Sequence, residues 1–390
     1  MTCDFDRPID RRNTNSLKYD CAAERGKPEG LLPLWVADMD FPAPDEVLED
    51  LQKAVAHGIF GYTEARDAYY EAVIAWVRAR YDLVVTKNEI VKTPGVVFAL
   101  AQMVRAFTQP GDGVLIQTPV YYPFYHIVRG NGRKLVVNPL KYADGAYHMD
   151  FDDFEAKIKT EQVRLFLLCS PHNPVGRVWT RAELLRLDEI CRAHKVLVVS
   201  DEIHADFVWQ GHTHTCFATI NEGAPLATAP SKTFNLAGLQ VANVLVKDDD
   251  LRVSLKKEID SSGYSQLGTM ALIACQSAYQ KGGPWLAELT AYLAKNIHFT
   301  REFLAMRLPK IKLVEPEGTY LLWLDFSACH LTQSALDERI VNGAGLWLDS
   351  GTLFGPEGEG FQRMNIACPR ATLSEALERL VQEFNSEENT

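Results

Sequence analysis

The sequence lacks the features that would assign it to a membrane, to secretion or to nucleic acid. No apolar run approaches the ~20 residues that a helix needs to cross a bilayer. Residues 1–10 are polar and acidic and contain no apolar core of a secretion signal. Acidic residues outnumber basic ones by 51 to 40, so the net charge of −11 excludes a broad basic face for nucleic acid. We therefore expect a cytoplasmic protein with no membrane or nucleic-acid partner, although a local basic pocket for a small anion stays open.

The chain also lacks paired motifs for metals or nucleotides. Its eight cysteines include no CxxC pair, which argues against a zinc ribbon or a thioredoxin-like site, and single cysteines in apolar runs are typical of reduced core thiols. The segment Asp201–His204 resembles the acidic box of some helicases, but the GxxxxGK(S/T) loop that this interpretation requires is missing. His212 and His214 have no zinc-ligand spacing, and we expect them on an exposed hairpin with no bound metal.

What remains is the composition of an ordinary globular protein, with 47% hydrophobic and 23% charged residues over 390 positions. Short apolar runs alternate with segments of helical periodicity, which is typical of a mostly parallel sheet covered on both faces. The expected strands are residues 114–118, 163–169, 196–200, 226–229 and 241–246. The expected helices are residues 45–57, 64–80, 95–107 and 180–194, the last opened by a capping box at Thr180 and Glu183.

We place this α/β unit, the large domain, at residues 46–282. Residues 1–45 are rich in turn formers, and we expect an N-terminal arm that also contributes to a small domain. Residues 283–390 are expected to form most of that smaller α+β domain. Its predicted elements are a long helix at 284–308, a strand at 320–326, a helix at 334–341 and a last helix opened by a capping box at Thr372 and Glu375.

Tyr121, Asn173, Asp201 and Lys232 each stand just after a predicted strand. The carboxyl ends of strands in an open α/β sheet meet at one edge, where ligands bind, so we expect these side chains to converge. Each residue alone is a weak signal, because an aspartate after a strand is commonly a helix cap and a lone lysine is commonly solvated. The ordered set of an aromatic ring, an amide, a carboxylate and an amine is what favours a functional site.

Three motifs at this edge are more specific. Ser170–Gly176 reads SPHNPVG, Asp201–His204 reads DEIH, and Ser231–Asn235 reads SKTFN. Together they resemble the fold-type I pyridoxal-phosphate enzymes of the aspartate aminotransferase superfamily, over nearly the whole chain. Residues 34–41 (LWVADMDF) and 363–370 (RMNIACPR) resemble its cystathionine β-lyase branch, the cysteine-S-conjugate β-lyases. The resemblance implies an α/β fold with a mostly parallel seven-stranded sheet flanked by helices, plus a smaller C-terminal domain.

The resemblance implies pyridoxal 5′-phosphate as the cofactor, and the residue chemistry agrees. Lys232 would hold it as a Schiff base and later move the Cα proton of the substrate. Asp201 would keep the pyridine nitrogen protonated. Asn173 would donate to the ring oxygen O3′, and His204, where relatives commonly have tyrosine, is the neighbouring candidate for the same atom. Tyr121 would stack on the ring and, with Lys232 and Asp201, completes the expected catalytic set.

The phosphate of the cofactor is expected at the start of the helix at 95–107. Val96 and Val97 would donate through their backbone N–H groups, and Ser231 could add its hydroxyl. The superfamily often places an arginine eight positions after the lysine, where this chain has Gln240. Tyr62 lies in a segment that in relatives crosses to the phosphate of a neighbouring subunit. The resemblance therefore implies a homodimer with shared active sites.

Arg363 is the expected partner of the α-carboxylate of an amino-acid substrate, because its fork of donors matches a carboxylate, and Arg370 is the second candidate. Trp35 and Asp38 are expected on the substrate side. The resemblance implies α,β-elimination from cystathionine- or cysteine-type substrates to a thiol, pyruvate and ammonia. Two alternatives stay open, namely an aminotransferase with the same fold and cofactor, and a regulatory protein that keeps the enzyme fold as a ligand sensor.

Overall fold

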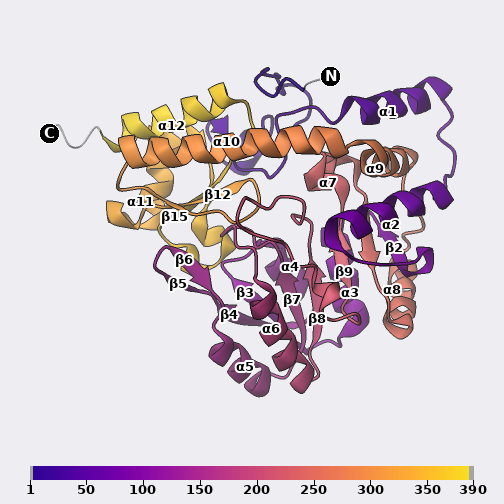
Figure 1. Ribbon diagram of the computed structural model, residues 1–390. Coiled ribbons are helices and arrows are strands. Elements are labelled where there is room, and N and C mark those ends of the chain that lie inside the picture. The colour runs from indigo at the N-terminus through magenta and orange to yellow at the C-terminus, as the bar shows by residue number, and fades with distance from the viewer. Residues whose placement is uncertain (1–2, 386–390) are drawn as a thin grey trace.

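A computed structural model describes residues 3–385, and its centre is a seven-stranded sheet (Figure 1). The strands are β2 (Ile90–Thr93), β3 (Gly113–Thr118), β4 (Lys134–Pro139), β7 (Val163–Cys169), β8 (Leu197–Asp201), β9 (Leu226–Thr228) and β10 (Ala242–Leu245). Their order is β2–β10–β9–β8–β7–β3–β4. Neighbouring strands from β9 to β4 are parallel, and β10 runs antiparallel to both of its neighbours. The predicted mostly parallel, seven-stranded α/β sheet is confirmed.

Helices cover both faces of this sheet because its central strands are apolar on both sides. In β7, Leu165 and Leu167 pack into one core layer, whereas Phe166 and Leu168 pack into the other. The first layer contains residues of α3 (Val96–Phe107), α4 (Pro123–Gly130) and α8 (Asp249–Ser261). The second contains residues of α5 (Phe151–Thr160) and α6 (Arg181–Ala193).

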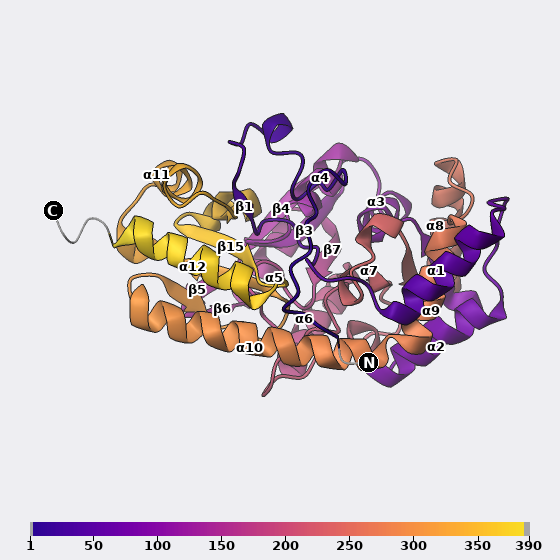
Figure 2. The same ribbon diagram turned by 90° about the horizontal axis from the view of Figure 1, so that it is seen from above.

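A second, antiparallel sheet and the longest helix form the C-terminal part. The strands are, in spatial order, β11 (Lys312–Val314), β12 (Leu321–Asp325), β15 (Phe361–Asn365) and β14 (Asp349–Ser350). The helices are α10 (Gly283–Arg307), α11 (Gln333–Glu338) and α12 (Arg370–Phe384). Helix α10 runs along the top of the molecule with α12 beside it (Figures 1 and 2). No helix within residues 3–385 is long and apolar enough to cross a membrane.

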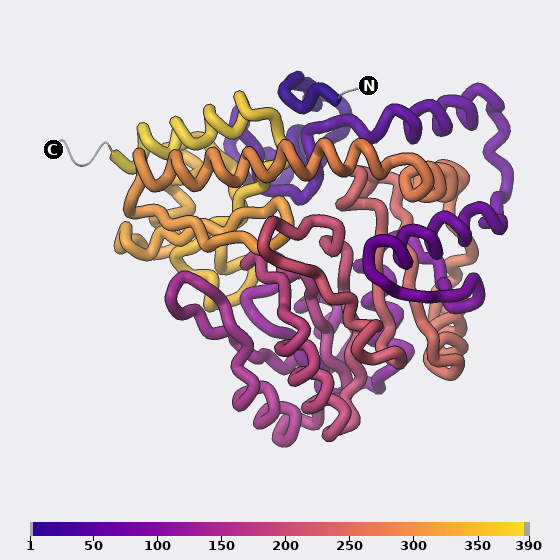
Figure 3. The backbone as a smooth tube through the Cα atoms, in the orientation of Figure 1, coloured from indigo at the N-terminus to yellow at the C-terminus, as the bar shows by residue number. Residues whose placement is uncertain are grey.

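The N-terminal segment lies against this C-terminal part, as the backbone trace shows (Figure 3). Strand β1 (Leu32–Pro33) pairs in parallel with β13 (Leu346–Trp347). Helices α1 (Asp45–His57) and α2 (Asp67–Tyr81) then pack on α9 (Thr269–Lys281). Further elements are the hairpin strands β5 (Lys141–Ala143) and β6 (Ala146–His148) and the short helix α7 (Pro230–Thr233).

Most predicted elements are confirmed, whereas several further helices and strands of the structure are not indicated by the sequence pattern. Helix α1 and strand β7 keep their predicted bounds, and Thr180 and Glu183 form the capping box of α6. The sequence pattern did not predict β2 and β4, which are the two edges of the large sheet. In β2, Lys92 interrupts a run of only four residues, and β4 begins at the exposed Lys134 and alternates between half-buried and buried positions, so neither edge strand shows a long apolar run.

The predicted start of the last helix is wrong. Helix α12 begins at Arg370, and Thr372 lies inside its first turn. The backbone N–H of Arg370 donates to the hydroxyl of Tyr292 at 2.7 Å, so a residue of α10 satisfies this first amide in place of a side-chain cap. A tertiary contact of this kind leaves no local signal in the sequence.

Residues 34–41, which we call the strap, thread between the two sheets, and side chains bind their carbonyl groups from both sides. From β15, the amide of Asn365 donates to the carbonyl oxygens of Val36 at 2.6 Å and Asp38 at 2.5 Å. From the loop after α7, the amide of Asn235 donates to the carbonyl oxygens of Met39 at 3.0 Å and Phe41 at 2.8 Å. The Asn235 Oδ1 also accepts the N–H of Met39 at 2.9 Å.

We predict that Asn235→Ala loosens the strap and lowers the free energy of unfolding by about 2–4 kcal/mol, because three hydrogen bonds to buried backbone groups are lost. Urea denaturation measures the change. Asn13→Ala is the matched control, since Asn13 shares the left-handed backbone of Asn235 (φ 61° and 56°) but has an exposed side chain. The control substitution should cost about 1 kcal/mol through backbone strain alone. Equal losses for the two variants would show that the Asn235 side chain does not hold the strap.

Candidate active site

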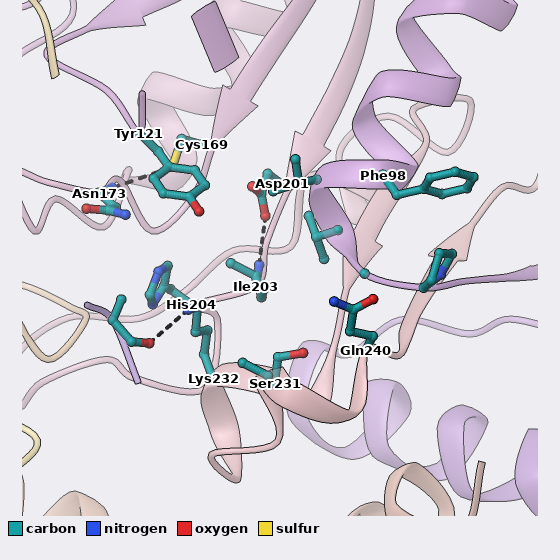
Figure 4. Close-up of a pocket in the computed structure, with 16 residues that line it drawn as sticks. Phe98, Tyr121, Cys169, Asn173, Asp201, Ile203, His204, Ser231, Lys232 and Gln240 are labelled. Atoms are coloured by element: carbon teal, nitrogen blue, oxygen red, sulfur yellow. Dashed lines mark hydrogen bonds between the residues drawn. The ribbon is translucent and has the colours of Figure 1, made fainter. Parts of the chain in front are cut away.

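A cavity of about 410 Å³ lies at the carboxyl ends of the parallel strands, where ligands bind in open α/β sheets (Figure 4). Asp201 is the last residue of β8, and Asn173 and Tyr121 stand in the segments after β7 and β3. Lys232 lies on α7, directly after β9. The structure brings most of the predicted site residues to this one cavity. They are Val96, Val97, Tyr121, Asn173, Asp201, His204, Ser231, Lys232 and Gln240.

Lys232 is a buried amine in this cavity. Its Nζ donates to the carbonyl oxygen of Ala37 in the strap at 2.8 Å. Burial lowers the pKa of Lys232 to about 8, with Arg363 acting in the same direction and Asp38 and Asp201 opposing. An appreciable fraction of the amine is therefore neutral, and so nucleophilic, near neutral pH.

Asp201 is a buried carboxylate that shares the cavity with Lys232. Its Oδ1 accepts the N–H of Ile203 at 3.1 Å. Burial raises the pKa of Asp201 to about 7, Glu202 raises it further, and the Ile203 N–H and Lys232 oppose the shift. A cationic N–H donor in the cavity would stabilise the ionised form.

Glu202 points away from the cavity into a separate polar cluster. It accepts hydrogen bonds from Ser200 Oγ and from the N–H of Phe217, each at 2.8 Å, and its Oε2 lies 2.8 Å from His214 Nε2. The expectation that His214 is exposed on a hairpin is therefore wrong, because its imidazole packs against this buried carboxylate. Within residues 3–385, no cluster of His, Cys, Asp and Glu could hold a metal ion.

Asn173 and His204 offer two polar contacts on the same side of the cavity. Asn173 Oδ1 accepts Arg363 Nη1 at 3.0 Å, which leaves the Asn173 Nδ2 group to donate elsewhere. His204 is buried, and its Nδ1 has no hydrogen-bond partner in the described part of the chain. Burial, with Lys232 and Arg363 adding to it, lowers the pKa of His204 well below its ordinary value, so the imidazole is neutral. Burial raises the pKa of Tyr121, so its phenol stays protonated.

The opposite end of the cavity is built to receive an anion. Gly95, with φ 128°, precedes α3 and aims the first N–H groups of that helix, including those of Val96 and Val97, into the cavity. Ser231 and Gln240 stand on the same wall. Gly95 is required here, because a residue with a Cβ atom rarely adopts this backbone conformation.

Arg363 lies behind Asn173 rather than on the cavity wall. Its Nη2 donates to the carbonyl oxygen of Trp35 at 2.8 Å and also contacts the carboxylate of Asp349. The Trp35 indole stacks on Trp347 with ring centroids 4.4 Å apart, so Trp35 reaches the site through its backbone. Asp349 is the residue that sequence reasoning missed. It lies on a two-residue strand, which is too short to show a periodic pattern.

The other predicted residues lie farther from the cavity. Asp38 lines a neighbouring cavity of about 670 Å³, and Lys232 lines both cavities. The Asp38 carboxylate forms an ion pair with Arg11 at 2.6 Å. Arg370 is held at the start of α12, where its Nε donates to Asn296 Oδ1 at 2.8 Å. Tyr62 is fully exposed on the segment between α1 and α2, so its side chain packs against no other described residue.

Comparisons with known proteins agree with this geometry. The model of the family "Aminotransferase class I and II" matches residues 29–380. Cystathionine β-lyase PatB of Bacillus subtilis (strain 168) is 45% identical over 380 residues, which cover 96% of this chain and 98% of PatB. The structure of cystalysin from Treponema denticola, which contains pyridoxal 5′-phosphate, has a TM-score of 0.96 and 37% identity over 99% of this chain and 100% of cystalysin. A pyridoxal-phosphate-bound C–S lyase from Staphylococcus hominis has a TM-score of 0.92 and 32% identity over 98% of both chains.

We predict that Lys232 reacts with a small aldehyde at lower pH than exposed lysines do. A pKa of about 8 leaves about two orders of magnitude more neutral amine at pH 7 than the usual lysine value of about 10.4. The experiment uses apoprotein, in which the Lys232 amine is free. Propionaldehyde with cyanoborohydride should label Lys232 at a rate that levels off above pH 8. Peptide mass spectrometry measures this rate, and Lys257, an exposed residue of α8, gives the reference profile in the same sample. Identical pH profiles for both lysines would contradict the lowered pKa.

Proposed function

The chain belongs to the class I and II aminotransferase family, and within it we propose that this protein is a pyridoxal-phosphate-dependent carbon–sulfur lyase. The reaction is α,β-elimination of a thiol from a cystathionine- or cysteine-type amino acid, after which water hydrolyses the remaining unsaturated amine to pyruvate and ammonia. One observation carries the proposal. The buried amine of Lys232 and the buried carboxylate of Asp201 share one cavity, in a chain whose relatives include a cystathionine β-lyase and a C–S lyase.

The residues around the cavity fit pyridoxal 5′-phosphate. The Lys232 amine matches the aldehyde of the cofactor, and the amide groups at the start of α3 match its phosphate. The raised pKa of Asp201 marks a carboxylate that a protonated ring nitrogen would stabilise. The His204 Nδ1 atom, which lacks a partner within residues 3–385, marks a polar contact that a ligand can complete.

When bound, the cofactor supplies an electron sink beside Cα, which accepts the electron pair of the broken Cα–H bond and returns it as the Cβ–S bond breaks. Lys232 would hold the cofactor aldehyde through Nζ, and the same amine would take the proton from Cα of the substrate. A pKa of about 8 suits an amine that must accept and return a proton near neutral pH. Asp201 holds the proton at the ring nitrogen. Lys232 or the protonated phenol of Tyr121 gives a proton to the departing sulfur.

The remaining polar groups fix the position of the reacting atoms. Asn173 donates through Nδ2 to the ring oxygen O3′, because its Oδ1 is already bound to Arg363. The neutral imidazole of His204 is the second partner for that side of the ring. Backbone N–H groups of Val96 and Val97 and the Ser231 hydroxyl hold the phosphate, and the Gln240 side chain stands at the same end as a neutral donor. Tyr121 covers one face of the ring.

Arg363 binds the α-carboxylate of the substrate. Its guanidinium is fixed by the strap and by Asn173, so it is oriented before substrate arrives. Arg370 is the weaker candidate, because its Nε is bound to Asn296 and its guanidinium stacks on Phe299 with its carbon 4.4 Å from the ring centre.

We expect the purified holoenzyme to convert L-cystathionine into pyruvate and ammonia in equal amounts, with release of a thiol. Chromatography and enzyme-coupled assays measure the three products. An aminotransferase would instead form a 2-oxo acid that keeps the sulfur, together with pyridoxamine phosphate, and a ligand-sensing regulatory protein would form neither set. Lys232→Ala should abolish turnover, whereas Lys257→Ala should retain it. Sulfur-containing 2-oxo acid as the main product would refute the lyase assignment.

The proposal includes a homodimer with shared active sites. Tyr62 is 100% exposed, and Ile59 and Phe60 beside it are 70% and 59% exposed. Exposed apolar and aromatic residues in one segment are typical of a surface that a partner covers. A second copy of the chain would bring Tyr62 to the phosphate end of its partner's cavity, where Gln240 contributes no charge. The cytoplasmic location stays a prediction from the sequence.

We predict that Tyr62 completes the site of the partner subunit. Lys232→Ala and Tyr62→Phe proteins are unfolded and refolded together, and turnover is measured. With free exchange, half of the dimers are mixed and each holds one intact site, so about a quarter of wild-type activity should return. A mixture of Lys232→Ala with Asp201→Ala is the matched control and should stay inactive, because both residues belong to the same cavity. If exchange is verified and the Tyr62→Phe mixture is also inactive, the shared-site proposal fails.

A further inference from the structure

Arg363 and Asp349 form a buried ion pair between neighbouring strands of the C-terminal sheet. They are direct cross-strand partners of β15 and β14, so their side chains lie on the same face. The Arg363 Nη2 contacts the Asp349 Oδ2, and the two side chains are only 3% and 4% exposed. The substrate-binding arginine therefore already has a carboxylate partner within its own chain.

The hydrogen bonds of Arg363 leave no complete binding edge for a second carboxylate. A guanidinium offers two edges with parallel N–H groups, Nε with Nη2 and Nη1 with Nη2, and both include an Nη2 hydrogen. The two Nη2 hydrogens are engaged by the carbonyl oxygen of Trp35 and by Asp349. Nη1 donates to Asn173, and Nε is buried without a partner in the described part of the chain. A substrate carboxylate must therefore share Arg363 with Asp349 or displace it.

The charged and titratable groups around Asp349 come from three further parts of the chain. Arg363 faces it from β15, and Arg25 and Lys27 add positive charge from the segment before β1. Tyr121 and Tyr122, from the turn after β3, lie close enough for the charge of Asp349 to raise the pKa of each. Burial raises the pKa of Asp349 above its ordinary value in spite of the three cations. A second carboxylate on Arg363 would raise that pKa further, because two like charges in contact cannot both stay ionised.

We propose that Asp349 is an internal carboxylate that engages Arg363 in the absence of substrate and takes up a proton from solvent when the substrate carboxylate binds. This inference rests on the proposed role of Arg363 in substrate binding. Protonated Asp349 is neutral and no longer competes for the Arg363 guanidinium, so the substrate carboxylate can form an ion pair with Arg363. Substrate binding is thereby coupled to proton uptake, and affinity becomes a function of pH. Asp349 acts through Arg363 and is a positioning residue.

The test uses holoenzyme and 3-(methylthio)propanoate, which has a carboxylate and a thioether but no amine, so it cannot react with the cofactor aldehyde. Calorimetric titration in buffers with different ionisation enthalpies counts the protons taken up per molecule bound. Above the pKa of Asp349 in the free protein, we expect about one more proton for wild type than for Asp349→Asn. Wild-type affinity should fall by about tenfold per pH unit in that range. Asp349→Asn should lack this slope and bind more tightly at pH 9.

Asp325→Asn is the matched control, because Asp325 is a buried carboxylate of the same sheet that bonds Tyr142 and the N–H of Ser327 instead of Arg363. It should keep the wild-type slope and proton count. The pH slope of wild type tests the proposal even if Asp349→Asn fails to fold. A flat wild-type profile, or an equal proton count in Asp349→Asn, would overturn the coupling alone. If Arg363→Ala binds the probe as tightly as wild type does, the assignment of Arg363 as the carboxylate partner fails instead.

Discussion

The carbonyl oxygen of Ala37 accepts a hydrogen bond from Lys232 Nζ at 2.8 Å and another from the hydroxyl of Tyr320 at 3.0 Å. Lys232 lies on α7, just after β9 of the large sheet, Tyr320 directly precedes β12, and Ala37 belongs to the strap near the N-terminus. A carbonyl oxygen has two lone pairs, so it can serve both donors at once. The reactive amine is thus positioned by a neutral group that is in place only after the strap has docked between the two sheets.

Exclusion of water then sets the protonation of every group in the cavity. Burial favours neutral forms, so it lowers the pKa of Lys232 to about 8 and raises that of Asp201 to about 7, and it keeps His204 neutral. The pKa values of the amine and the carboxylate thereby both lie close to neutral pH. A ligand that carries an anionic phosphate and a protonated ring nitrogen supplies opposite charges to the two ends of this cavity, and each end stabilises the charge that it meets.

The sequence predicts the site residues that stand just after a strand. It does not predict those that reach the site because two separate segments of the chain pair with each other. Asp201 and Lys232 could be found because each comes directly after a buried apolar run. Asp349 could not, because β14 has two residues and its partner Arg363 lies 14 positions away along the chain. Trp35 was found by its motif, but its indole packs on Trp347 and only its carbonyl oxygen reaches Arg363. Similarity to a motif can identify a residue of the site. It does not show whether the side chain or the backbone of that residue makes the contact, because this depends on the path of the backbone.

The two buried carboxylates, Asp201 and Asp349, differ in which bound group stabilises their ionised form. Within residues 3–385, Asp201 accepts no hydrogen bond from an arginine, so the arrival of a protonated ring nitrogen would stabilise its ionised form. Asp349 already has Arg363, so the arrival of a substrate carboxylate does the opposite. One guanidinium cannot fully compensate two buried anions. The substrate carboxylate therefore binds beside Arg363 together with a proton on Asp349, whereas the charge of Asp201 is balanced by a cation beside it. The substrate carboxylate and the proton are then taken up together, and the binding step, like the chemical step, depends on where a proton resides.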